Sequence, residues 1–121
     1  MDIHESGEDY LEQILMFSKL NGHARATNIA AALNYTKASV SIAMKNLREQ
    51  GYIAVDSSNH ITLTEAGHAI ADRIYARHEK LTAYLISIGV NPDTAEKDAC
   101  KMEHDLSEET YQAMLRTMNK D

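Results

Sequence analysis

Three side chains with metal-binding chemistry lie close together near the end of the sequence. Cys100, Glu103 and His104 stand at i, i+3 and i+4, the spacing at which side chains share one face of an α-helix. A thiolate, a carboxylate and an imidazole directed at one point form a donor set for a transition metal, and they are poorly suited to a hydrophobic core. The spacing therefore predicts a metal site on a helix.

Other residues earlier in the chain offer further ligands. Asp9 and Glu12 are also three residues apart, and two carboxylates on one helix face repel each other unless a cation or solvent separates them. On their own they fit the solvated start of a helix better than a metal site. His78 lies within a long predicted helix and has the same two interpretations, ligand or surface histidine. Together, these side chains would form one or two adjacent sites joining three helices, suited to manganese or iron and shifted toward softer metals by the thiolate.

The hydrophobic pattern predicts the helices that position these residues. Apolar residues at helical spacing favour helices over residues 8–20, 28–33, 37–50, 65–88, 92–104 and from 108 onward. Side chains able to cap helix N-termini precede five of them: Thr27, Thr36, Thr64, Asn91 and Ser107. The short second helix, tight turn and third helix have the arrangement of a helix-turn-helix.

Between residues 52 and 63 the apolar residues alternate, with the polar run Asp56-Ser57-Ser58-Asn59 in the middle, which predicts a β-hairpin. The expected fold is mainly α-helical: a winged helix-turn-helix with a small hairpin wing, followed by a long helix and a helical dimerisation and metal-binding segment. We expect a DNA-binding domain at 1–72 and the helical segment at 73–121.

The charge distribution fits either a DNA-binding surface or an ordinary mixed surface, equally well on charge alone. The net charge is −6, yet residues 21–51 carry four basic residues against one acidic residue. A recognition helix enters the major groove by its N-terminal half, on the side opposite its buried face. The predicted DNA contacts are Arg25, Thr27, Thr36, Lys37, Ala38, Ser39, Ser41, Ile42 and Lys45. Ile42 fits either a base contact or partial burial against the second helix, and the hairpin tip, without Lys or Arg, predicts no strong contact of its own.

Association and location also follow from the chain. A length of 121 residues leaves room for only a modest core, which favours a homodimer, and the apolar far end of the long helix is the expected interface. Its residues are Leu81, Tyr84, Leu85 and Ile88. The lone Cys100 excludes an internal disulfide, and no apolar run approaches the roughly 20 residues of a membrane span. We therefore expect a cytoplasmic protein with no membrane contact.

Several short motifs resemble one known family over nearly the whole chain. They are Glu8-Asp9-Tyr10-Leu11-Glu12-Gln13-Ile14, Thr27-Asn28-Ile29-Ala30, Ser39-Val40-Ser41, Leu63-Thr64-Glu65-Ala66-Gly67, Ala99-Cys100-Lys101-Met102-Glu103-His104 and Leu106-Ser107. The sequence resembles the diphtheria toxin repressor and manganese transport regulator family of metal-dependent repressors. The resemblance implies a homodimer on palindromic operator DNA that controls metal uptake or efflux genes in response to Fe(II) or Mn(II).

The resemblance also implies a ligand set and a metal preference. The family's ligands match Asp9, Glu12, His78, Cys100, Glu103 and His104. Asp9 and Glu12 resemble the manganese-type members, whereas Cys100 resembles the iron-type members and favours iron. Thr82 replaces the glutamate of the iron type's auxiliary site, so that version of a second site is not expected. The SH3-like third domain of the iron type is also expected to be absent.

Three other functions were considered. A zinc hydrolase would need a second histidine on the helix after His78-Glu79, and none is present at that spacing. A winged-helix regulator that responds to a small ligand or to oxidation of Cys100 would leave the acidic residues merely solvated. A winged helix used only for protein contacts would show no salt-sensitive affinity for DNA.

Overall fold

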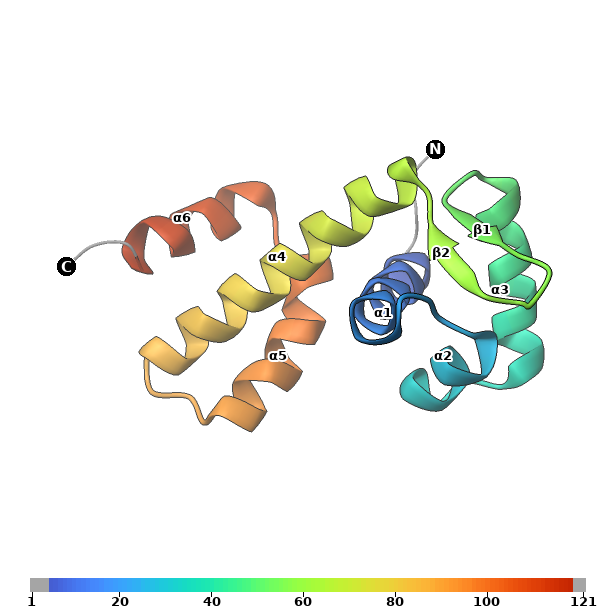
Figure 1. Cartoon of the computed structure of the whole chain (residues 1–121). Helices are drawn as coiled ribbons and strands as arrows, with labels where there is room; N and C mark the ends of the chain where they lie inside the picture. Colours follow the sequence, from blue (N-terminus) through green and yellow to red (C-terminus); the bar gives the residue numbers. More distant parts are fainter. Residues whose placement is uncertain (1–4, 119–121) are drawn as a thin grey trace. The chain divides into compact units, whose positions relative to one another are not determined.

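The computed structural model describes residues 5–118 and is mainly helical (Figure 1). Its elements in chain order are α1 (Glu5–Asn21), α2 (Ala26–Leu33), α3 (Lys37–Glu49), β1 (Ile53–Val55), β2 (Ile61–Leu63), α4 (Glu65–Ser87), α5 (Pro92–Asp105) and α6 (Glu108–Met118). The chain forms two compact units that divide after Asp72, within α4. The predicted winged helix-turn-helix with a long helix and a helical segment after it is confirmed.

The first unit holds α1 to α3 and the hairpin, which lies beside α3 (Figure 1). The two strands pair antiparallel with Ala54 opposite Thr62, and Ala24 adds a bridge to Ile61. The alternation seen in the sequence buries Ile53 and Ile61, leaves Val55 and Leu63 half-buried, and exposes Ala54 and Thr62 between them. The unit's core is formed mainly by Leu11, Ile14, Ile29, Val40 and Leu47.

The start of α2 differs from the prediction. Thr27 does not cap this helix, because α2 begins at Ala26 and its N-cap residue is Arg25. The side-chain oxygen of Asn28 accepts a hydrogen bond from the Arg25 backbone amide at 3.2 Å. The helix therefore starts at Ala26, two residues before the start at residue 28 that a cap at Thr27 predicted. The predicted cap of α3 is confirmed, since the Thr36 hydroxyl accepts from the Ser39 amide at 3.1 Å.

A glycine permits the close approach of α4 to the hairpin. A Cβ atom at Gly67 would collide with the backbone oxygen of Tyr52 and lie 3.2 Å from the Leu63 side chain. The Thr64 hydroxyl caps the same turn by accepting from the Gly67 amide at 3.2 Å. Together these contacts fix where the hairpin ends and α4 begins.

The second unit packs the later part of α4 against α5 and α6. Its core contains Leu81, Ala99 and Tyr111, one from each helix. The partly buried residues packed around them are Leu85, which was predicted at the dimer interface, and Met102, Leu106, Met114 and Leu115. Leu81 was predicted at the dimer interface, and this is wrong, because its side chain is 0% exposed within the chain's own core. Ile88, also predicted there, is 59% exposed directly after the last residue of α4.

Candidate metal centre and nucleic-acid interface

Three of the predicted ligands meet in the second unit. His78 lies on α4, and Cys100 and Glu103 lie on α5. Each offers one possible ligand atom, and these three atoms lie within 4.8 Å of one another. Two ligand atoms of one metal ion lie at most about 4.0–4.6 Å apart, the separation they have on opposite sides of the ion at metal–ligand distances of about 2.0–2.3 Å. Only a small adjustment of side chains would bring the three donors onto one ion.

Local packing explains why these side chains converge. Asn91 caps α5 by accepting from the Asp93 amide at 2.9 Å, and helical spacing then places Cys100 and Glu103 on one side of the helix. The buried Ala99 lies against Leu81, three residues after His78 in α4. The small alanine side chain permits close packing of the two helices, which brings His78 opposite Glu103.

Glu103 is the feature of this cluster that most resembles a metal ligand. The residue is only 2% exposed, and its Oε2 lies 2.9 Å from Nδ1 of His78. Its Oε1 is buried and has no hydrogen-bond partner among the residues that the structure describes. The nearest imidazole nitrogen recorded for it is Nε2 of His104, at 3.5 Å. A buried carboxylate oxygen without a hydrogen bond is costly, and a cation at this point would remove that cost.

The remaining predicted ligands have different surroundings. The His104 side chain is almost fully covered, whereas Cys100 is exposed. Asp9 and Glu12 lie on α1 in the first unit, the former partly exposed and the latter buried. Within the second unit the structure brings His78, Cys100 and Glu103 together, and it places Nε2 of His104 3.5 Å from Oε1 of Glu103.

The predicted DNA-reading residues of α3 form an exposed surface. Val40, Met44 and Leu47 are buried, and the predicted contacts from Lys37 to Lys45 all lie on the exposed side of the helix. Ile42 is 64% exposed, so the alternative of partial burial against α2 is wrong. An exposed isoleucine on a recognition helix is available for a thymine methyl group.

A basic cavity borders this surface in the first unit. It has a volume of about 430 Å³ and lies where the start of α2, the middle of α3 and the hairpin meet. Arg25, Lys45 and Arg48 line it without any acidic residue, and Asn59 brings in the hairpin. Arg48 and Asn59 were not among the predicted contacts. Arg48 contributed to the local positive charge, but its place beside the hairpin depends on tertiary packing.

A second feature that the sequence did not reveal is the histidine that contacts Arg25. Nη2 of Arg25 lies 2.9 Å from Nε2 of His60, which is 35 residues later in the chain. His60 stacks on His23 with ring centroids 3.7 Å apart, and its Nδ1 lies 3.4 Å from Asp56. The backbone amide of His60, assisted by that of Ser58, holds the pKa of Asp56 below its ordinary value. The hairpin thus fixes the direction of the Arg25 side chain.

Comparison with known proteins identifies the chain. Residues 2–61 match the N-terminal DNA-binding domain of iron-dependent repressors, and residues 64–120 match their metal-binding and dimerisation domain. The regulator MntR of Bacillus subtilis is 36% identical over 102 residues, which are 84% of this chain and 72% of MntR. The chain belongs to the iron-dependent repressor family. A transcriptional regulator of Methanocaldococcus jannaschii is 36% identical to this repressor over 118 residues, covering 96% of this chain and 94% of that protein.

Solved structures agree with the fold of this iron-dependent repressor. The crystal structure of IdeR from T. acidophilum superposes with a TM-score of 0.83 at 25% identity, over all of this chain and 56% of that one. A manganese-dependent repressor in complex with manganese gives the same TM-score at 23% identity and supports the fold alone. The chain therefore spans about half the length of these structures.

Family membership settles the broad class of activity. The chain is a metal-dependent transcriptional regulator that acts on DNA, with a domain for dimerisation, and it is not an enzyme. A divalent metal is its cofactor. None of the helices between residues 5 and 118 combines the length and apolar character needed to span a bilayer.

Proposed function

We propose that this repressor senses Fe(II) or Mn(II) and controls genes of metal homeostasis from palindromic operators, as a homodimer in the cytoplasm. The observation that carries the proposal is the meeting of His78, Cys100 and Glu103 at one point, with a buried oxygen of Glu103 left without a hydrogen bond. Imidazole and carboxylate ligands suit both metals.

The proposed ligand set contains all the candidates from the sequence. Their types support it, because each can donate a nitrogen, oxygen or sulfur atom to a divalent ion: Asp9, Glu12, His78, Cys100, Glu103 and His104. A bound ion would offset the negative charge of the buried Glu103 carboxylate. The Cys100 thiolate favours iron over manganese, because sulfur ligands prefer softer metals than carboxylates do.

The proposed DNA contacts come from the exposed side of α3 and from the basic cavity beside it. Lys37, Lys45 and Arg25 would meet phosphates, and Ser41 and Ile42 would meet base edges. Metal binding would regulate this contact by favouring dimer conformations whose recognition helices match the spacing of two half-sites. Of the predicted interface residues, the proposal keeps Tyr84, Leu85 and Ile88.

Anaerobic metal competition tests the proposal. The metal-free protein is titrated with Fe(II), Mn(II) and Zn(II), while binding to a labelled DNA fragment from upstream of its own gene is followed and footprinted. We expect Fe(II) or Mn(II) to strengthen DNA binding at a site with two-fold symmetry. Cys100→Asp should shift the preference from Fe(II) toward Mn(II), whereas the matched surface change Asp98→Asn should not. A response to neither metal, or an asymmetric footprint, would contradict the proposal.

A further inference from the structure

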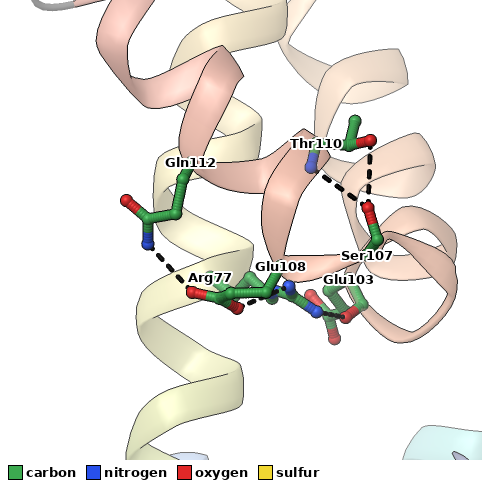
Figure 2. Close-up of polar contacts among 6 residues, drawn as sticks. All are labelled: Arg77, Glu103, Ser107, Glu108, Thr110 and Gln112. Carbon is green, nitrogen blue, oxygen red and sulfur yellow. Dashed lines mark hydrogen bonds and ion pairs between the residues drawn. The ribbon is translucent and has the colours of Figure 1, made fainter.

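Arg77 connects all three helices of the second unit (Figure 2). It lies in α4 directly before His78, and its Nη1 donates to the backbone oxygen of Glu103 at 2.9 Å. Its Nη2 donates to Oε2 of Glu108 at 3.2 Å, and its guanidinium carbon lies 4.6 Å from the centroid of the Tyr111 ring. The Arg77 side chain is only 14% exposed, whereas the Glu108 side chain is 72% exposed, so water competes less for the contact with the Glu103 backbone than for the ion pair with Glu108.

The first contact satisfies a carbonyl group at the end of α5. The last carbonyl groups of a helix have no amide of that helix to accept from. Met102 is paired with the amide of Leu106 at 3.1 Å, and the chain then turns to an extended conformation. Arg77 supplies a donor for the next carbonyl, that of Glu103, while His78 contacts the Glu103 carboxylate. Two consecutive residues of α4 thus hold the backbone and the side chain of the same proposed ligand.

The second contact reaches the first turn of α6. The Glu108 carboxylate, at a helix N-terminus where negative charge is favoured, accepts from Arg77 on one oxygen and from Gln112 at 2.9 Å on the other. The backbone of Glu103 and the start of α6 are therefore joined through a single guanidinium (Figure 2). A displacement of the Glu103 backbone must therefore either move the Arg77 guanidinium or break one of its two hydrogen bonds, to Glu103 or to Glu108.

We propose that Arg77 is a positioning residue that fixes Glu103 for the metal and couples metal occupancy to the docking of α6 on α4. This inference rests on the proposed metal function of His78 and Glu103. Arginine suits the role because its planar guanidinium donates in fixed directions to two acceptors at once, whereas lysine offers a single ammonium. Residues that orient ligands from outside the coordination sphere typically change metal affinity by about 10–100-fold.

The test compares Arg77→Met, Arg77→Lys and the exposed control Arg116→Met in the full chain. Mn(II) affinity is measured by competition with a chelating dye, and amide exchange is followed at Thr110, whose amide donates to Ser107 Oγ at 3.1 Å in the first turn of α6. We expect Arg77→Met to weaken Mn(II) binding by about 10–100-fold. Mn(II) should slow exchange at Thr110 in the wild type and in Arg116→Met, but not in either Arg77 variant.

The outcomes separate the two proposals. If the wild-type chain binds neither Mn(II) nor, in an anaerobic titration, Fe(II), the proposed function itself is wrong. If the wild type binds Mn(II) and a folded Arg77→Met variant binds it equally well, only the positioning role is overturned. Should Arg77→Met fail to fold, Arg77→Lys decides by the same criteria: wild-type affinity together with slowed exchange at Thr110 would refute the role of Arg77.

Discussion

Glu103→Gln should weaken metal binding and, in the metal-free protein, stabilise the fold. Glutamine has nearly the same shape, and its side-chain oxygen can still accept from Nδ1 of His78 at the site of the present 2.9 Å contact. The substitution removes the charge of a residue that is 2% exposed. The two effects therefore have opposite signs and can be measured separately.

The magnitudes follow from the surroundings of this carboxylate. Replacing a charge-assisted hydrogen bond by a neutral one loses about 1 kcal/mol. Burial of one ion costs several kcal/mol even after the protein relaxes, and Oε1 has no hydrogen bond among the described residues to offset it. We expect a net gain of about 1–3 kcal/mol in the free energy of unfolding without metal. Loss of a direct ligand should exceed the effect of removing a supporting residue, so affinity should fall by at least about 100-fold.

The free energy of unfolding without metal is measured by denaturant unfolding with a chelator present, at one fixed protomer concentration. The metal affinity is measured by metal competition. Glu109→Gln removes the same charge from an exposed position and serves as the control. Unchanged metal affinity in Glu103→Gln would refute the assignment of this residue as a ligand. A loss of more than about 1 kcal/mol of metal-free stability would refute the reasoning about its burial cost.

Three further predictions concern other parts of the chain. Leu81→Ala should lower the free energy of unfolding by about 2–5 kcal/mol, whereas Ile88→Ala should weaken dimerisation in sedimentation with little change in protomer stability. Ile42→Ala should leave stability within about 0.5 kcal/mol but reduce discrimination at one operator position, measured with single-base variants. Because the pKa of Asp56 is lowered, its support of the hairpin is present above the ordinary pKa of 3.8 and lost as the pH falls through the lowered value. Exchange of the His60 amide should therefore accelerate only in that acidic range, and Asp56→Ala should accelerate it at neutral pH.

Local patterns in the sequence predicted most of the fold. The caps at Thr36, Thr64, Asn91 and Ser107 are present because each depends only on residues within a few positions along the chain. The cap at Thr27 was wrong because the competing side chain of Asn28 starts α2 earlier. Ranges of the other helices differ from the prediction by a few residues at their ends.

Long-range packing accounts for what the sequence could not reveal. The apolar stripe predicted over residues 65–88 does not distinguish a residue that packs inside the unit, such as Leu81, from one left exposed, such as Ile88. Spacing placed Cys100, Glu103 and His104 on one helix face, but only tertiary structure shows that His78 faces Glu103. The contacts of Arg77 with Glu103 span 26 residues and have no local signature.

The central claim is that metal bound at His78, Cys100 and Glu103 strengthens binding to operator DNA. The most direct measurement is the dissociation constant for a labelled operator with saturating Fe(II) or Mn(II) and with chelator, in the wild type and in His78→Ala. We predict at least tenfold tighter binding with metal in the wild type, equivalent to about 1.4 kcal/mol of coupling, and a much smaller effect in the variant. Equal affinity with and without metal, or an undiminished metal effect in His78→Ala, would contradict the account.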